Sequence, residues 1–367
     1  MKINFDCRFY KGYKPCDYSK KEGVICETCP YYKSYSKKIL IIKLDAIGDV
    51  LRTTCILQGL KKKYSDSYIE WITRSNAIEL LMNNPYIDEV LAYNFDSVLR
   101  LQNTYYDIVI NPSNDYVSSA LLSIVKGRIK KGFGLGRNGV IYAVNEEAKK
   151  WLLMGIFDSV KKDNKESYQK MVADIVGIER ENLEIIFELD EREKKFAEVL
   201  KNKWDLNNYK IIGINTGSGS RWPQKMLSTE QIITLINQLQ KSDKVKILLL
   251  GGPEEQDKNK KILEKTKGVI DTGCNNTLSE FCAIVSLCNV VICGDTLAIH
   301  IASGLKKKII ALFGPTSSAE IEDYGLVTKI QSDINCLCCY SSCEKHPNCM
   351  NLIDMDKIMK VLESQIY

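Results

Sequence analysis

The chain has 367 residues, of which 45% are apolar and 26% are charged, and this composition is typical of a globular protein. Its length exceeds one ordinary hydrophobic core and suits two domains of roughly 150 residues each. The net charge of +5 is too small for a nucleic-acid-binding protein, so we expect no nucleic-acid partner. An anionic ligand or membrane surface remains open as an alternative to a plain lysine-rich surface.

The sequence shows no signal peptide and no apolar run of the ~18 residues that a spanning helix needs. We therefore expect a cytoplasmic protein, either free or peripherally associated with the inner face of the membrane. Fourteen cysteines are more than such a protein needs for its core, and most of them gather near the two ends of the chain. In a reducing compartment, clustered cysteines favour a metal over a disulfide.

Residues 1–36 are expected to form a Cys-rich extension without regular helical or strand periodicity. Its cysteines follow the spacing C-x8-C-x9-C-x2-C, and the last pair resembles the knuckle of a zinc or iron site. A structural metal is one interpretation, and a thiol-rich flap packed on the first domain is the other. The candidate ligands are Cys7, Cys16, Cys26 and Cys29.

The segment 38–54, KILIIKLDAIGDVLRTT, predicts a buried strand, a tight turn and a helix. Open α/β sheets bind ligands beyond the carboxyl ends of their strands, and Asp45 and Asp49 lie there. We interpret Asp45 as part of the loop's own hydrogen bonding. Alternating strand and helix patterns then predict a doubly wound, Rossmann-like domain over residues 37–188. Its further strands are expected at 67–73, 88–93 and 106–113.

A basic segment follows these strands and a helix, and two interpretations of it stay open. It could meet an anionic acceptor, or it could be a solvated loop. Its cations are Lys126, Arg128, Lys130 and Lys131.

A charged amphipathic helix over residues 190–204 is expected to open the second domain, with Phe196, Val199 and Leu200 on one face. Four apolar strands then each end in glycine and small polar residues, which exposes backbone N–H groups at the strand ends. These segments are 210–220, 244–255, 290–296 and 307–318. They predict a second doubly wound, Rossmann-like domain over residues 189–349.

Three loops of the second domain could bind a nucleotide. The loop 215–225, NTGSGSRWPQK, offers glycines, hydroxyls and cations to a diphosphate, although an ordinary flexible loop would look the same. The loop 251–255 could present a carboxylate to a ribose diol. In segment 294–300, Asp295 or Thr296 would cap a helix whose free N–H groups attract anions. A plain N-cap without ligand is the alternative, and we interpret His300 as a core histidine.

The C-terminal region combines a Cys-rich hairpin with a terminal helix. Four thiolates within fourteen residues could surround a structural zinc or iron ion, and reduced thiols in a packed hairpin are the alternative. The candidate ligands are Cys336, Cys339, Cys343 and Cys349, with Cys338 to spare and His346 as a substitute. Residues 350–367 are expected to form a helix that packs back on the N-terminal domain.

The ordered set of motifs resembles glycosyltransferase family 9, the ADP-heptose heptosyltransferases with the two-domain GT-B fold. The resemblance covers about 38–350 and is carried by KILIIKLDAIGDVLRTT, NTGSGSRWPQKMLS, LLLGGPEE, GDTLAIHIASG and ALFGPTSS. It implies two Rossmann-like domains that face a cleft. The Cys-rich extension lies outside the family's ordinary core.

The resemblance also implies inverting transfer of a heptose from an ADP-heptose donor to an acceptor hydroxyl. Asp49 matches the family's general base, and Lys225 matches the lysine that contacts the diphosphate. Glu255 matches the acidic residue that binds the nucleotide ribose, and Asp295 matches the acidic residue that contacts the donor sugar. No metal or other cofactor is required for this catalysis. The nucleotide-sugar residues implied in this way are Gly48, Thr216, Ser218, Lys225, Glu255, Asp295, Thr296, Leu297 and Ala298.

The expected acceptor is a saccharide, glycolipid or protein of the cell envelope, as in lipopolysaccharide biosynthesis. Many family members have glycine where this chain has Leu297, and the usual basic residues for an anionic acceptor have no clear counterpart. Two other interpretations stay open. One is a nucleotide-sugar epimerase of the same architecture, and the other is a non-catalytic binding protein organised by metal clusters.

Overall fold

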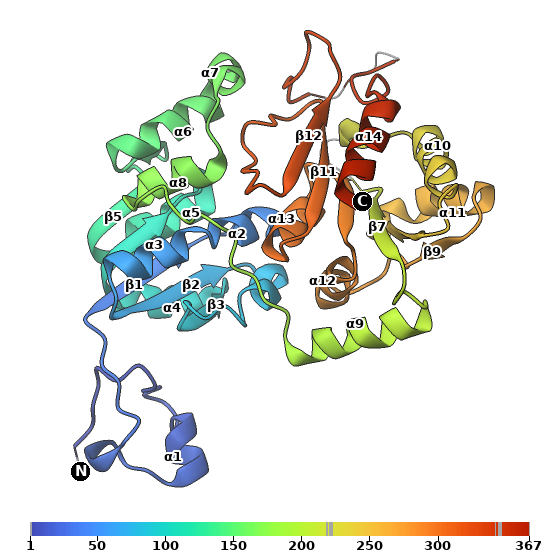
Figure 1. The fold of residues 1–367 in the computed structure, drawn as a ribbon. Helices are drawn as coiled ribbons and strands as arrows, with labels where there is room; N and C mark the ends of the chain where they lie inside the picture. Colours follow the sequence, from blue (N-terminus) through green and yellow to red (C-terminus); the bar gives the residue numbers. More distant parts are fainter. Residues whose placement is uncertain (1, 218, 220–222, 342, 344–346, 367) are drawn as a thin grey trace. The chain divides into compact units, whose positions relative to one another are not determined.

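The structure, a computed structural model, describes residues 2–217, 219, 223–341, 343 and 347–366. The chain divides into two compact units, and neither unit is continuous in sequence. The first comprises Met1–Asp45, Ile56–Leu152 and Val172–Leu183, and the second comprises Ala46–Cys55, Leu153–Met171 and Glu184–Tyr367. Each unit contains one six-stranded sheet (Figure 1).

The sheet of the first unit has the strand order β3-β2-β1-β4-β5-β6. All neighbouring pairs are parallel except the antiparallel pair of β5 and β6. Apolar residues of β1 and β4 pack with helix residues into one buried cluster. The strands are β1 (Lys37–Ile42), β2 (Ser67–Thr73), β3 (Glu89–Ala92), β4 (Tyr105–Asn111), β5 (Lys126–Leu135) and β6 (Ile141–Ala143).

The basic segment that could have been a solvated loop is the first half of strand β5. Lys130 and Lys131 turn their ammonium groups onto backbone carbonyls of Leu122 and Val176. The prediction of a solvated loop is therefore wrong, because these residues pair with β4 as a parallel strand. The lysines are tolerated there because their aliphatic stems cover apolar surface while their ammonium groups are hydrogen-bonded.

Helices of the first unit surround this sheet, and the N-terminal extension adds its own short elements (Figure 1). Arg8 ties the extension to the sheet, because its guanidinium pairs with Asp88 and donates to the Ser67 carbonyl. The helical elements are α1 (Asp17–Glu22), η1 (Cys26–Thr28), α3 (Ile56–Lys63), η2 (Ser75–Leu80), α4 (Phe95–Asn103), α5 (Tyr116–Ile124), most of α6 (Glu146–Ile156) and the end of α8 (Tyr168–Val176).

The sheet of the second unit is parallel throughout, with the order β12-β11-β10-β7-β8-β9. Both sheets thus have the doubly wound arrangement that the alternating patterns predicted. The two outer strands of the second sheet carried no sequence signal that we recognised. The strands are β7 (Lys210–Asn215), β8 (Val245–Leu250), β9 (Val269–Asp271), β10 (Val290–Gly294), β11 (Lys308–Phe313) and β12 (Val327–Gln331).

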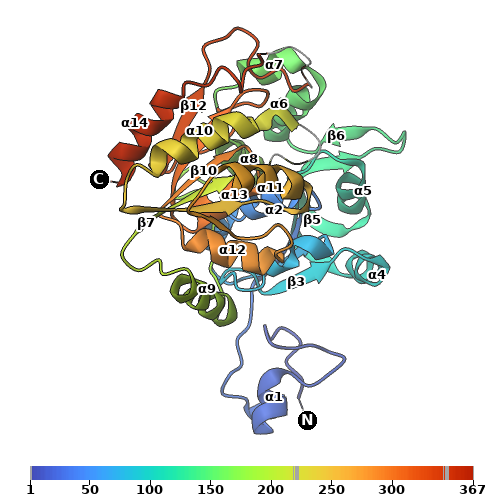
Figure 2. The same cartoon turned by 90° about the vertical axis from the view of Figure 1, so that its right-hand side faces the viewer.

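Helix α14 packs on the second sheet and beside α10, with Ile358, Leu362 and Ile366 buried in the core (Figure 2). This differs from the expected packing on the N-terminal domain, because the apolar face of α14 matches the open side of β10 to β12. The helical elements of this unit are α2 (Ile47–Thr53), α7 (Asp158–Asp163), α9 (Glu191–Lys203), η3 (Pro223–Lys225), α10 (Thr229–Leu239), η4 (Pro253–Glu255), α11 (Gln256–Lys265), α12 (Leu278–Ser286), α13 (Leu297–Gly304) and α14 (Met355–Ile366).

Helix α9 has a narrower apolar face than the sequence suggested. Ala197 and Leu200 are buried, but Val199 is 57% exposed. Asp190 caps the helix through a capping box with Glu193, which explains where it begins. Among the described residues, no helix has the length and apolar character needed to cross a lipid bilayer.

Candidate active site

Asp49 lies in the first turn of α2, a helix that belongs to the second unit and contacts α13. Gly48 makes this contact close, since a Cβ at Gly48 would lie 2.8 Å from Cδ2 of His300. Real Cβ atoms do not approach so closely, so any larger residue at position 48 would displace the buried His300 ring. The Gly-Asp pair of the first motif therefore lies against the helix that follows β10.

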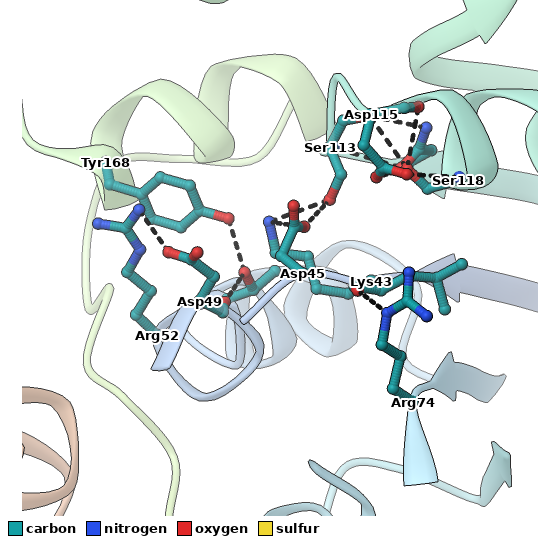
Figure 3. A network of polar contacts seen from close by, with 12 residues as sticks. Lys43, Asp45, Asp49, Arg52, Arg74, Ser113, Asp115, Ser118 and Tyr168 are labelled. Atoms are coloured by element: carbon teal, nitrogen blue, oxygen red, sulfur yellow. Dashed lines mark hydrogen bonds and ion pairs between the residues drawn. The ribbon is translucent and has the colours of Figure 1, made fainter. Parts of the chain in front are cut away.

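The carboxylate of Asp49 is held by a group that the sequence analysis did not single out. Nη2 of Arg52 lies 2.6 Å from Oδ1 of Asp49, one helical turn away (Figure 3). The guanidinium carbon of Arg52 lies 3.8 Å from the ring centroid of Tyr168, which is a cation–π contact. The Tyr168 hydroxyl lies 2.6 Å from Oγ1 of Thr53. The Thr53 hydroxyl in turn donates to the Asp49 carbonyl.

The loops after β7 and β10 bring Lys225 and Asp295 together. Nζ of Lys225 donates to the Asp295 carbonyl at 2.9 Å and lies 3.8 Å from its carboxylate. Gly294 permits this approach, because a Cβ there would lie 2.4 Å from the Lys225 carbonyl oxygen. A cation and a carboxylate thus lie together just before the first turn of α13.

Thr296 is the N-cap residue of α13, but its side chain makes no capping hydrogen bond. Its hydroxyl instead lies 3.4 Å from Nδ2 of Asn215. Leu297 opens the helix without a positive φ, so the backbone does not require a glycine at this position. Because Ala298 is buried, its contribution to a ligand would come from its backbone N–H.

His300 is buried behind this helix terminus. Burial lowers its pKa to about 4, and the nearby positive charges of Arg52 and Lys225 act in the same direction. The carboxylates of Asp295 and Asp49 oppose the shift only in part. His300 is therefore neutral at pH 7, although charged side chains of α2 and of the loops after β7 and β10 act on it.

A second cluster forms around Thr216 and Glu255. Oε2 of Glu255 accepts from the Gly252 N–H at 2.9 Å, and a Cβ on Gly217 would lie 3.1 Å from the Glu255 carboxyl group. The Thr216 hydroxyl is buried and lies 2.5 Å from Oδ1 of Asn259. The side chain of Thr216 thus points into the protein, while Glu255 borders the glycine loop. Ser218, the other expected hydroxyl, lies outside the described residues.

Asn259 connects this cluster to a cavity of about 590 Å³. This volume lies within the range of small-molecule sites. Nδ2 of Asn259 donates to the Cys274 thiol, and Lys258 donates to the carbonyls of Thr216 and Leu227. Burial lowers the pKa of Lys258. Asn259 and Lys258 were missed because they lie in a polar helical stretch without a motif, and only folding turns them toward Thr216.

Asp45, the other carboxylate of the first motif, has its partners in the first unit. Nζ of Lys43 lies 2.8 Å from Oδ2 of Asp45 and donates to the Ser113 hydroxyl at 3.1 Å (Figure 3). Ser113 in turn donates to the Asp45 carboxylate. The loop's own hydrogen bonding explains only part of this arrangement, because Ser113 follows β4.

The cysteines of the described chain form no disulfide. Cys16 caps α1 through its sulfur. Burial raises the pKa of the Cys349 thiol, and the thiols of Cys336, Cys339 and Cys343 act in the same direction. Nevertheless, no three His, Cys, Asp or Glu side chains in the described ranges are arranged closely enough to hold a metal ion. His346 lies outside these ranges.

Comparison with known proteins tests the resemblance. A family model described as glycosyltransferase family 9 (heptosyltransferase) matches residues 97–349. A lipopolysaccharide heptosyltransferase 1 from Campylobacter coli is 23% identical over 353 residues, covering 89% of this chain and 98% of that protein. The family 9 glycosyl transferase of Veillonella parvula has a TM-score of 0.71 at 18% identity, over 90% of this chain and 97% of that one.

The structure of E. coli ADP-heptose LPS heptosyltransferase II has a TM-score of 0.66 at 17% identity, over 90% of this chain and 98% of that one. The two parallel-sheet units therefore have the GT-B fold, as the motifs implied. The family model spans more than half of the chain, and the resemblance inferred from the motifs is confirmed. This chain belongs to glycosyltransferase family 9 and is a glycosyltransferase.

Proposed function

We propose that this enzyme transfers a heptose from ADP-heptose to a hydroxyl of a cell-envelope saccharide, with inversion at the anomeric carbon. The observation that carries the proposal is that α2, which bears Asp49, contacts α13, in front of which Lys225 and Asp295 lie together in the same unit. A carboxylate next to a cation and free helix N–H groups suits a base beside a diphosphate leaving group. The named donors and acceptors of similar heptosyltransferases support the same assignment.

Each part of the site has a role in this reaction. Asp49 accepts the proton of the acceptor hydroxyl as its oxygen attacks the anomeric carbon and the bond to the diphosphate breaks. Lys225 and the N–H groups at the start of α13 stabilise the negative charge that develops on the diphosphate. Glu255 accepts hydrogen bonds from the ribose hydroxyls, and the cavity beside Asn259 has room for the nucleobase.

Thermal-shift measurements with nucleotides test the donor. We expect ADP and ADP-heptose to raise the unfolding temperature, because both bind only the folded chain. UDP and UDP-sugars serve as the matched controls. Stabilisation by UDP-sugars alone would contradict an ADP-linked donor. Incubation with ADP-heptose without acceptor also separates the proposal from epimerisation, which would change the sugar while leaving the nucleotide attached.

We also propose a structural zinc or iron ion at the C-terminal cysteines. The close spacing of Cys336, Cys339, Cys343 and Cys349 in the sequence supports it, although the described side chains are not arranged closely enough to hold an ion. Metal analysis of protein purified under reducing conditions tests this point. We expect about one ion per chain, lost in Cys339→Ser but kept in Cys282→Ser, whose cysteine is buried elsewhere. Metal-free, folded wild-type protein would contradict the site.

A further inference from the structure

We propose that Arg52 and Tyr168 are positioning residues for the Asp49 carboxylate, and that the loop after β11 holds Tyr168 in place. The inference rests on the proposed function, in which Asp49 is the base. It gives a role to Glu320 and Glu322, which follow the ALFGPTSS segment and to which the sequence analysis assigned no function.

The first step is the pair of Arg52 and Asp49. The Arg52 side chain is 11% exposed and the Asp49 side chain is 33% exposed, so the pair presents its carboxylate side to solvent. Nε of Arg52 is buried and has no hydrogen-bond partner among the described residues. A buried N–H without an acceptor is unfavourable, so hydrogen bonding through Nε does not explain a guanidinium at this position. Fixing the carboxylate does explain it.

The second step is the ring under the guanidinium. Tyr168 is 1% exposed, and its aromatic face lies 3.8 Å from the guanidinium carbon. Its hydroxyl contacts Thr53, and Thr53 donates to the Asp49 carbonyl (Figure 3). Asp49, Arg52, Tyr168 and Thr53 thus form a closed ring of contacts. A planar guanidinium stacked on an aromatic ring is restricted to few orientations. A lysine ammonium at the same position would not be restricted in this way.

The third step is the anchor of Tyr168. Its backbone N–H donates to the Glu320 carbonyl at 3.0 Å. The Glu320 carboxylate accepts from the Tyr340 hydroxyl at 2.8 Å, and Ser167 donates to Glu322 at 2.5 Å. The start of α8 is therefore fastened to the loop that follows β11, and this loop determines where the Tyr168 ring lies.

The arrangement has an electrostatic consequence. Burial opposes the charge of Arg52, yet its pKa is raised, with Asp49 as the largest favourable contribution. The other groups near this pair are Tyr168 from α8, Glu320 after β11, Asp295 and His300 around the start of α13, and Lys225 after β7. Since a neighbouring cation favours the charged carboxylate, removing Arg52 should make Asp49 harder to deprotonate.

Steady-state kinetics of Arg52→Gln against pH tests the inference. We expect kcat to fall about 100-fold, because a misplaced base costs roughly that much, while KM for the donor changes little. The acid limb of the kcat profile should move up by about one pH unit. Arg52→Lys should restore the acid limb but recover kcat only in part. Arg180→Gln, which removes an arginine–carboxylate pair of the first unit, is the matched control.

Tyr168 variants separate the ring from its hydroxyl. Tyr168→Phe keeps the aromatic face and should keep most of kcat, whereas Tyr168→Leu should resemble Arg52→Gln. ADP binding and the unfolding temperature of each variant show whether it is folded. A folded Arg52→Gln or Tyr168→Leu with kcat within about two-fold of wild type and an unmoved acid limb would overturn the inference.

A substrate-free measurement distinguishes this failure from failure of the proposed function. The Asp49 carboxyl signal is assigned in ¹³C NMR spectra by its loss in Asp49→Asn, and its titration is compared between wild type and Arg52→Gln. An upward move of the titration supports the positioning role whatever the substrate is. An unchanged titration overturns it. If Asp49→Asn keeps full turnover, the proposed base is wrong even where the titration moves.

Discussion

The two aspartates of the first motif lie four residues apart in the chain and have different surroundings. Asp45 pairs with Lys43, which is 3% exposed, and with Ser113 at the end of β4, so it joins strands of the first sheet. Asp49 pairs with Arg52 and lies in a helix that packs on α13 of the second unit. The comparison teaches that one short motif can stabilise one domain and supply a reactive group to the other.

The largest expected effect concerns Asp49 and tests whether the two aspartates have different roles. Asp49→Asn keeps the shape of the side chain but removes the base, so we expect kcat to fall by about 100- to 10,000-fold while ADP binding is retained. Turnover and ADP affinity of the purified variant measure this. Asp45→Asn is the control and should lower stability more than kcat. Equal losses of kcat in the two variants would contradict the separation of roles.

The pH dependence of stability tests the burial of His300, which lies against the helix that carries Asp49. His300 stays neutral in the folded chain with a pKa of about 4, whereas the unfolded chain takes up a proton near pH 6.5. Stability is therefore unaffected by this group above pH 6.5 and falls as the pH drops from 6.5 to 4, by about 3 kcal/mol in all. Urea unfolding of wild type and His300→Gln across this range should show a loss that is larger in wild type by about this amount. Parallel curves would contradict it.

Lys43→Met tests the Asp45 side. It leaves the partly buried carboxylate of Asp45 without its cation, and we expect the free energy of unfolding to fall by about 2 kcal/mol. The double variant Lys43→Met with Asp45→Asn should recover part of the loss, as measured by chemical denaturation. Additive losses would show that the pair is not coupled.

The smallest expected effect concerns Thr53. Thr53→Val keeps the shape of the side chain and removes the hydroxyl between Tyr168 and the Asp49 carbonyl, so stability should fall by about 1 kcal/mol. Denaturation measures the loss, and Tyr168→Phe should produce a similar one. No measurable change in either variant would show that the hydroxyl pair contributes little to the ring.

Much of the fold could be predicted from the sequence, because buried parallel strands carry unbroken apolar runs. The run at 39–42 and the segment 67–73 lie in β1 and β2 as expected. Strands β5 and β9 were harder to predict. Strand β9 has three residues, and β5 begins with alternating cations, so neither carries a clear apolar signal.

Some residues of the candidate site could likewise be predicted from the sequence, and others could not. The Gly-Asp pairs and the loop 215–225 were recognisable because glycines and small polar residues beyond an apolar strand suit phosphate binding, although an ordinary loop has the same pattern. Arg52 had a local signal, three residues after Asp49 in a predicted helix, but an i,i+3 ion pair is common on any helix surface. Tyr168 had none, since it lies 119 positions after Asp49 in sequence numbering and reaches it only through folding.

The sequence by itself determined the two doubly wound domains, the family and the loops that carry glycine and charge, because these depend on local pattern. The tertiary structure decided which groups meet. It paired Asp45 with Ser113, placed Arg52 on the ring of Tyr168, buried His300 against Gly48, and packed α14 on the second sheet. The physical reason is that ion pairs, burial and close helix contacts depend on distances in space, which residues far apart in the chain acquire only when the core forms.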